Sequence, residues 1–146
     1  MKSFIAIILI ITFSVSCDSS KKSTTESASG ASLKGTYWKL TELAGTAVTA
    51  REGVKEVYLK ISSTDSTVQG NGGCNGFGGN YTLGNGDRIK FSRMISTMMA
   101  CDGLDVENSL YRALENTDSY VIKGDTLQLN RARMAPLARF VAVAGK

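Results

Sequence analysis

The chain lacks histidine altogether and has only one proline and three cysteines among its 146 residues. Histidine is the usual general base near neutral pH. Its absence excludes Ser-His-Asp and Cys-His nucleophile systems, and also zinc sites of the HExxH and Cys2His2 kinds. Any catalysis would have to rest on carboxylates, lysines, tyrosines or thiols. Residues 33–146 place no nucleophile, base and oxyanion site together, so we expect no catalytic residue, no cofactor and no metal site.

The sequence also lacks a basic block. It carries 17 Lys and Arg against 13 Asp and Glu, and the net charge of +4 is spread along the chain. Proteins that bind nucleic acid usually concentrate their Lys and Arg on one face, so we expect no nucleic-acid partner. The length suits one domain, and 42% apolar residues are enough for a single core.

No apolar run is long enough to span a bilayer comfortably. The longest, from Phe4 to Val15, has 12 residues, whereas a transmembrane helix needs about 20. It follows Met1-Lys2-Ser3 and precedes small residues, as the apolar region of a signal peptide does. The sequence therefore predicts a cleaved signal peptide over residues 1–16, with an uncleaved anchor as the alternative.

A tether follows this leader. Residues 14–17 (Ser-Val-Ser-Cys) resemble a bacterial lipobox, with Ser14 where Leu is usual, which predicts lipidation of Cys17. Residues 18–32 have no large apolar side chain and are rich in Ser and Thr, as solvated tethers are. We therefore expect a protein held in the bacterial cell envelope by lipid at Cys17, in the outer membrane facing the periplasm, although Asp18 is an ambiguous sorting signal.

Short apolar runs separated by turn residues dominate residues 33–146. Val57, Leu59 and Ile61 alternate strictly, which is typical of a half-buried strand. Tight turns at residues 84–87 and 123–125 predict antiparallel pairing of the strands beside them. The predicted strands are Tyr37–Leu43, Val57–Ile61, Thr67–Gly70, Gly79–Leu83, Arg88–Phe91, Ser119–Ile122, Thr126–Leu129 and Leu137–Val143.

One segment has helical periodicity. Val106, Leu110 and Leu114 recur every four residues and predict an amphipathic helix over residues 105–116. Asp102 or Asp105 is expected to cap its start, and Thr117-Asp118 to end it. Asp102, Asp105 and Glu107 form an acidic cluster without the calcium-loop pattern, which helix capping explains better. The predicted fold is α+β and mainly β: a curved antiparallel sheet or partly closed barrel of about eight strands with one covering helix.

Two motifs stand out. Residues 70–81 (GNGGCNGFGGNY) hold six of the fifteen glycines, but no Gly-Lys-Ser/Thr follows, which argues against a phosphate-binding loop. We interpret these glycines as structural, since glycine permits bulges and close backbone approach. Residues 97–101 (TMMAC) form the second motif, and core packing is the default role of its methionines.

The order of these motifs resembles the META domain, the family of the heat-shock protein HslJ. The resemblance covers about residues 34–143, and the pairing of Gly-Cys-Asn with Thr-x-Met-Ala-Cys is its most specific part. It implies a small α+β fold with a curved antiparallel sheet and no established enzymatic activity. The family is linked to heat-shock response, novobiocin tolerance and, in protozoan relatives, virulence and secretion. The residues that carry the family motif are Trp38, Gly73, Asn75, Gly79, Tyr81, Thr97, Met99 and Glu107.

Once Cys17 is assigned to lipid, Cys74 and Cys101 remain as a pair in an oxidising compartment, which predicts a disulfide. The alternative is a redox pair, with Lys90 or Arg93 depressing a thiol pKa. The spacing of 27 residues without CxxC favours a structural bond.

Three functions follow as expectations. The first is a non-catalytic envelope lipoprotein, a monomer that supports envelope integrity or stress and drug tolerance through an unknown envelope protein partner. The second is a carrier of a small hydrophobic molecule or lipid, since the family resembles secretin pilot proteins, some of which hold lipid. Inward-facing Val57, Leu59, Ile61, Phe91 and Phe140 would line such a cavity or pack as core. The third is a thiol oxidoreductase that uses Cys74 and Cys101.

Overall fold

The computed structural model describes residues 30–146, so the predicted signal peptide, Cys17 and most of the predicted tether lie outside the described residues. Among residues 30–146, no helix is long and apolar enough to cross a membrane. The elements are β1 (Tyr37–Leu43), β2 (Thr46–Ala47), β3 (Tyr58–Ile61), β4 (Thr67–Asn71), β5 (Gly76–Leu83), β6 (Ile89–Ser96), α1 (Leu104–Asn116), β7 (Ser119–Lys123), β8 (Thr126–Asn130) and β9 (Ala138–Val143).

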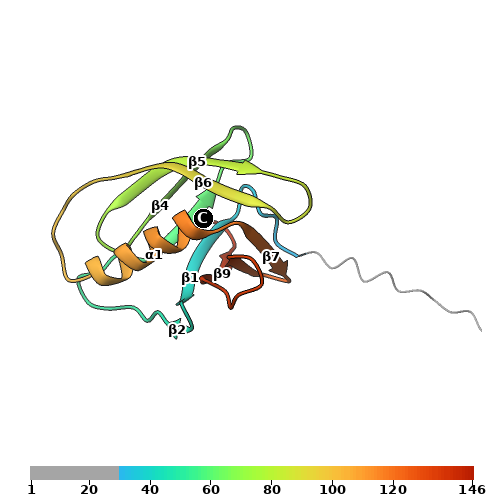
Figure 1. The fold of residues 1–146 in the computed structure, drawn as a ribbon. Helices are drawn as coiled ribbons and strands as arrows, with labels where there is room; N and C mark the ends of the chain where they lie inside the picture. Colours follow the sequence, from blue (N-terminus) through green and yellow to red (C-terminus); the bar gives the residue numbers. More distant parts are fainter. Residues whose placement is uncertain (1–29) are drawn as a thin grey trace, which may run out of the picture.

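The strands form one curled antiparallel sheet in the order β6-β5-β4-β3-β1-β9-β8-β7, with the short β2 paired to the end of β1. β1 and β9 are far apart in the sequence but lie side by side in the sheet, with Tyr37 opposite Val143. The predicted fold class, mainly β with a curved antiparallel sheet and one helix, is confirmed (Figure 1).

The sheet closes on itself at only one point. Arg88, just before β6, forms an isolated antiparallel bridge with Ser119 at the start of β7. Two hydrogen bonds support it: the Ile89 amide donates to the Asp118 carbonyl (3.2 Å) and the Tyr120 amide to the Asp87 carbonyl (2.8 Å). Beyond this bridge α1 lies across the open side of the sheet (Figure 1). The molecule is therefore a partly closed barrel with a helix over its gap.

The interior is a single apolar core. Trp38, Leu59 and Phe140 are fully buried on the inner faces of β1, β3 and β9, and Leu110 and Leu114 of α1 are fully buried against them. Full burial of such a side chain contributes about 1.5 to 3 kcal/mol. The five residues that sequence reasoning placed inward, Val57, Leu59, Ile61, Phe91 and Phe140, all belong to this core.

Two strands are longer than the sequence predicts. β5 begins at Gly76, three residues before the predicted Gly79, and β6 runs to Ser96 instead of ending at Phe91. Their pairing shifts register between Gly78 and Asn80, and Arg93 on the bulged strand has a φ of +52°. A β-bulge adds one residue to a strand and shifts the alternation of its side chains. The part of the strand beyond the bulge therefore cannot be recognised from apolar and polar alternation in the sequence.

The helix matches its predicted span to within one residue, but its predicted cap is wrong. The residue before α1 is Gly103, and no side chain caps the first turn, so neither Asp102 nor Asp105 has that role. A Cβ at Gly103 would lie 3.0 Å from Val54 Cγ1, a contact too tight for a capping side chain. The predicted end is confirmed: Thr117 follows the last turn, and its amide donates to the Leu114 carbonyl.

Candidate functional site

Asn75, in the loop before β5, joins three segments of the chain. Its side-chain oxygen accepts hydrogen bonds from the Thr97 hydroxyl (2.7 Å) and the Met99 amide (2.8 Å). Its side-chain nitrogen donates to the Met99 carbonyl (3.0 Å) and to Glu107 Oε1 (2.8 Å). The residue is 2% exposed, and every hydrogen-bonding position of its amide is used. We call Asn75, Thr97, Met99 and Glu107 the hub.

Glu107 is the charged member of the hub and is 3% exposed. Besides Oε1, its Oε2 accepts from the Asn75 amide (2.6 Å) and the Cys74 amide (3.3 Å). A buried carboxylate is tolerated when both oxygens are hydrogen-bonded, as here. The acidic residue that the sequence suggested as part of a capping cluster instead fixes the loop before β5. Its spacing of three from Leu110 and seven from Leu114 places it on the buried helix face and could have indicated this.

The glycines beside the hub are structural. A Cβ at Gly72 would lie 2.6 Å from Glu107 Cγ, so only glycine lets the carboxylate approach this loop. Gly73 has a φ of +112°, in the region that favours glycine, and its carbonyl accepts from the Lys55 amide at 2.8 Å. This agrees with the structural interpretation of the motif's first half.

Cys74 and Cys101 form a disulfide, as the cysteine count predicted. Their Cα atoms are 5.9 Å apart, within the range that disulfides span. Cys74 is 5% exposed and directly precedes Asn75. The disulfide therefore links the loop before β5 to the loop of residues 97–101, the same two segments that Asn75 links by hydrogen bonds. The covalent and polar connections therefore reinforce one junction.

The two methionines of the second motif are not core residues, contrary to their default role. The Met98 side chain is 97% exposed and that of Met99 61% exposed, although Asn75 holds the Met99 backbone through both its amide and its carbonyl. The segment lies at the left of Figure 1, in the loop that leaves β6 for α1. Ile95, near the end of β6, is 74% exposed. A fixed backbone here presents apolar side chains to solvent.

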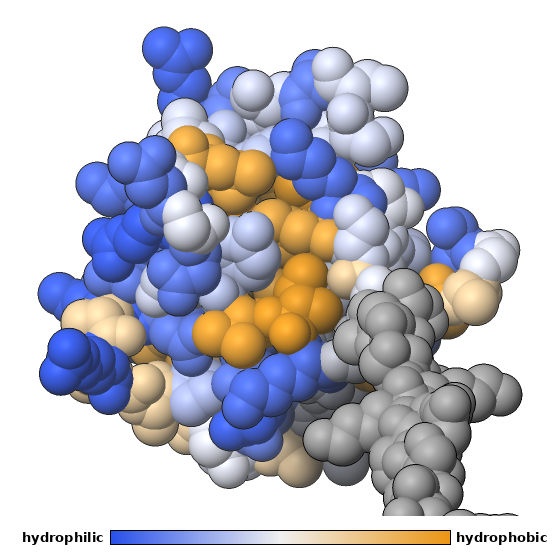
Figure 2. All heavy atoms as spheres, turned by 90° about the vertical axis from the view of Figure 1, so that its right-hand side faces the viewer, coloured by the Kyte–Doolittle hydropathy of each residue, from blue (hydrophilic) through white to orange (hydrophobic). Residues whose placement is uncertain are grey.

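A second apolar area lies at the opposite end of the molecule. Figure 2 views the face on the right of Figure 1 and shows apolar side chains gathered near its centre, surrounded by hydrophilic ones. The described chain begins at this end, where the Ala31 amide donates to the carbonyl of Gly124 in the β7–β8 turn (3.0 Å). A chain arriving from the N-terminal side therefore reaches the domain at this face.

The remaining motif residues serve the fold. Trp38 is fully buried in β1, and its indole N–H donates to the Leu33 carbonyl (3.1 Å). The Tyr81 hydroxyl lies between the carbonyls of Ser62 (3.0 Å) and Asp65 (3.2 Å), which ties β5 to the β3–β4 turn. Gly79 faces the β6 bulge, where a Cβ would lie 2.5 Å from Met94 Sδ.

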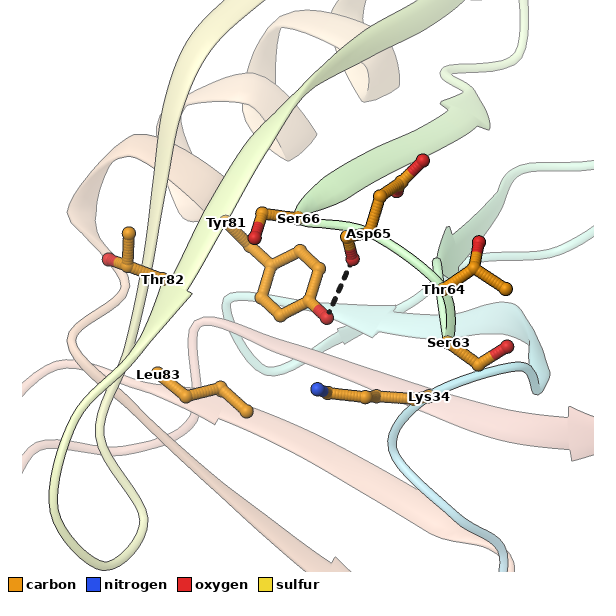
Figure 3. Close-up of a pocket in the computed structure, with 8 residues that line it drawn as sticks. All are labelled: Lys34, Ser63, Thr64, Asp65, Ser66, Tyr81, Thr82 and Leu83. Carbon is orange, nitrogen blue, oxygen red and sulfur yellow. Dashed lines mark hydrogen bonds between the residues drawn. The ribbon is translucent and has the colours of Figure 1, made fainter.

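A hollow of about 440 Å³ lies beside Tyr81. Figure 3 shows Lys34, Leu83 and the turn of residues 63–66 arranged around the Tyr81 ring. The Lys34 ammonium lies 5.6 Å from the ring centroid, within the range of a cation–π contact. The Tyr81 hydroxyl is directed at backbone carbonyls, so it is a structural group and not a free acid or base.

A second cluster is centred on Glu56 and lies nearer the surface. This carboxylate accepts from Lys146 Nζ (2.7 Å), Lys39 Nζ (2.8 Å) and the Tyr37 hydroxyl (2.9 Å). The hydrogen bonds from Lys146 and then Lys39 lower the pKa of Glu56 to about 2. Burial, followed by the hydrogen bond to Glu56, raises the pKa of Tyr37. We call these four residues the Glu56 cluster.

The hub is a structural junction more than a reactive site. Both oxygens of Glu107 and both polar atoms of the Asn75 side chain are engaged, and the two sulfur atoms are bonded to each other. Among residues 30–146, no group of three or more His, Cys, Asp and Glu side chains is placed to hold a metal ion. What the junction does is hold the loop of residues 97–101 in one position.

Comparisons with known proteins agree with this geometry. The META domain profile matches residues 31–144. A protein from Burkholderia xenovorans, solved by NMR, is 25% identical, with a TM-score of 0.61 over 77% of this chain and 84% of that chain. A second NMR structure is 19% identical, with a TM-score of 0.56 over 73% of this chain and 88% of its own; that likeness shows the fold alone. No curated protein matches.

Proposed function

Since the chain belongs to the META domain family, we propose that it is a non-catalytic lipoprotein of the bacterial cell envelope, of the HslJ type. In this proposal it supports envelope integrity and tolerance of heat and drugs, and it acts as a monomer that binds another envelope protein.

The observation that carries the proposal is the state of the 97–101 loop. The hub hydrogen bonds and the disulfide fix the backbone of the 97–101 loop, whereas the Met98 and Met99 side chains remain exposed. Methionine is common at surfaces that bind other proteins, because its flexible thioether adapts to different partners. An apolar side chain on a fixed backbone loses little further conformational freedom on binding. Both properties suit a protein-binding surface.

The test replaces the exposed methionines. In a bacterium whose own copy is deleted, wild-type protein is expected to restore survival at high temperature and in novobiocin. The double variant Met98→Ser/Met99→Ser should fail to restore it while accumulating to the same level. Met134→Ser is the matched control, since Met134 is 65% exposed on another loop. Full restoration by the double variant would show that these side chains bind no essential partner.

Membrane attachment is the second part of the proposal. It is supported by the apolar run of residues 4–15, by the lipobox-like residues before Cys17 and by the Ser/Thr-rich tether. The tether would enter the domain at the face of Figure 2, so that this face lies nearer the membrane than the 97–101 loop. Radioactive palmitate should label the wild-type protein but not Cys17→Ser, and outer-membrane fractions should contain only the former. Equal labelling of both would refute lipidation at Cys17.

A carrier function is the second candidate, favoured by one surface hollow. It has a volume of about 240 Å³ and lies between β1, the segment of residues 48–57 and α1. Its apolar lining residues are Leu40, Val48, Ala50, Val54, Val57 and Val106, and Lys39, Arg51, Lys55 and Glu56 also line it. The interior of the barrel is filled by core side chains, so an acyl chain would have to enter this hollow. Saturable binding of a fluorescent fatty acid, abolished by Val106→Asp, would support the carrier; a lack of saturation would argue against it.

A thiol oxidoreductase is the third candidate and has the least support. Cys74 is 5% exposed and Cys101 is half-buried, and the bond between them lies within the hub junction. A disulfide that is used in exchange needs one sulfur open to an attacking thiolate. Loss of tolerance in the variant Cys74→Ser/Cys101→Ser, at unchanged protein level and fold, would revive this candidate.

A further inference from the structure

Two glycines of β5 have no role in holding the fold together. Gly76 and Gly78 are outside the positive-φ region. A Cβ at Gly76 would meet only the Gly70 carbonyl at 3.8 Å, and one at Gly78 only the Val68 carbonyl at 3.7 Å, both ordinary contacts. Glycine inside a strand costs roughly 0.5 to 1 kcal/mol relative to alanine. The chain therefore accepts a loss of stability at two positions where a Cβ would fit.

These glycines leave a groove on the outer face of the sheet. In the strand register, Gln69 lies opposite Gly78, and Gly78 opposite Ile95; in the next row Tyr58 lies opposite Asn71, and Asn71 opposite Gly76. The hollow between the flanking side chains has a volume of about 380 Å³. We call it the glycine groove; it is lined by Tyr58, Gln69, Gly70, Gly76, Phe77, Gly78, Ile95, Ser96 and Thr97.

The lining has a consistent chemistry, since none of its nine residues carries a charge. One wall has the Tyr58 ring, which stacks on Tyr37 with centroids 4.4 Å apart and is therefore held in one orientation. Gln69 adds an exposed amide on this face, and Tyr58 carries a phenolic hydroxyl. An aromatic wall, neutral hydrogen-bonding groups and a flat backbone floor suit a ligand that is uncharged, flat and rich in hydroxyl groups.

A polypeptide segment fits this groove less well. Extended peptides usually bind a sheet by adding a strand at a free edge, where backbone hydrogen bonds supply the affinity. β5 has no free edge, because β4 and β6 are paired to it on either side. A phosphate-bearing ligand would need a cation, and the lining contains none.

From these observations we propose that the glycine groove binds a neutral oligosaccharide, with a sugar ring on the floor of Gly76 and Gly78 and against the Tyr58 ring. The Gln69 amide and the Tyr58 hydroxyl donate and accept the hydrogen bonds to its hydroxyl groups. The groove is lined by residues of β3–β6 and by Thr97, and the inference does not depend on lipidation or on the exposed Met98 and Met99 side chains, so each proposal can fail without the other.

The test titrates two neutral probes, chitotetraose and maltotetraose, into ¹⁵N-labelled residues 30–146, which contain the whole described sheet and core. At least one probe should shift the amide signals of Gly76, Gly78, Ser96 and Thr97 saturably, with a dissociation constant on the order of 1 mM or below. Gly78→Val fills the groove and should weaken binding at least about tenfold. Its melting temperature should equal or exceed that of the wild type, since valine suits a strand better than glycine.

Thr82→Val is the matched control: it puts the same side chain at an exposed position of β5 outside the groove, and it should bind like the wild type. Three results would overturn the proposal. Neither sugar shifts the signals; Gly78→Val binds as well as wild type; or Gly78→Val melts at a lower temperature, which would make this glycine structural. Shifts caused by an uncharged extended peptide and by neither sugar would assign the groove to a protein segment instead.

Discussion

The hub and the Glu56 cluster are built on the same plan in different surroundings. In each, one carboxylate accepts three hydrogen bonds: Glu107 from two backbone amides and the Asn75 side chain, Glu56 from two lysines and Tyr37. Glu107 is 3% exposed, whereas the Glu56 side chain is 31% exposed and its lysines more so. Water can replace the lost partners of Glu56 but cannot reach those of Glu107. The comparison indicates that the access of water, and not the number of hydrogen bonds, determines how much each carboxylate contributes to the free energy of unfolding.

The largest effect should come from removing the centre of the hub. Asn75→Ala leaves the Thr97 hydroxyl, the Met99 amide and one oxygen of Glu107 without their partner inside the protein. We expect a loss of roughly 3 to 5 kcal/mol in the free energy of unfolding, measured by urea denaturation. Asn80→Ala, on the outer face of β5, is the control and should cost less than about 0.5 kcal/mol. A loss below 1 kcal/mol for Asn75→Ala would show that the hub is open to water.

The disulfide should rank second. It closes a loop of 27 residues, for which the chain-entropy account gives about 3.5 kcal/mol. The double variant Cys74→Ser/Cys101→Ser should therefore unfold at a lower urea concentration, and dithiothreitol should lower the midpoint of the wild type but not that of the variant. A wild-type midpoint that is indifferent to dithiothreitol would mean that the bond contributes nothing.

The most direct comparison makes the same Glu→Gln substitution in the hub and in the Glu56 cluster. Glu107→Gln replaces one of the two accepting carboxylate oxygens with an NH2 group, which then faces another donor. We expect a loss of about 2 kcal/mol in the free energy of unfolding. Glu56→Gln should cost less than about 1 kcal/mol, because its partners lie at the surface. Equal losses for the two variants would contradict the role assigned to burial.

The smallest effect is the pH dependence of the Glu56 cluster. The pKa of Glu56 is lowered in the folded protein to about 2, from an ordinary value of 4.5. Its contribution is therefore present above pH 4.5 and is lost as the pH falls from there towards 2. We expect that Glu56→Gln removes less than about 1 kcal/mol of acid-dependent stability, and less still in 1 M salt. An identical acid titration of stability in wild type and variant would refute this.

Much of the fold was readable from the sequence because it is encoded locally. β1 has its predicted bounds, and α1 differs by one residue, since alternation and helical spacing involve near neighbours. β5 and β6 were predicted too short, because Gly76 and Gly78 do not resemble strand residues and Arg93 interrupts the alternation at a bulge. Their strand state comes from pairing with partners on both sides.

The candidate site was only half predictable for a similar reason. The cysteine pair could be counted, but the role of Glu107 depends on a loop that lies 32 residues earlier in the chain. A helix-capping role was the local explanation, and the burial of a carboxylate is a tertiary property. In the same way, the exposure of Met98 and Met99 accompanies the hydrogen bonds that Asn75 makes to the Met99 backbone, and no local sequence pattern encodes those bonds.

The position of β9 between β1 and β8 has a consequence for biosynthesis. β9 is the last of the described strands in the chain, and its pairing joins β8 and β7 to β1 in the strand order. Until residues 138–143 have left the ribosome, the two halves of the sheet can meet only through the bridge between Arg88 and Ser119. Pairing across about 100 residues is also slow. Completion of the sheet therefore depends on the last stretch of the described chain, and an edge strand of each half stays open to other partners until then.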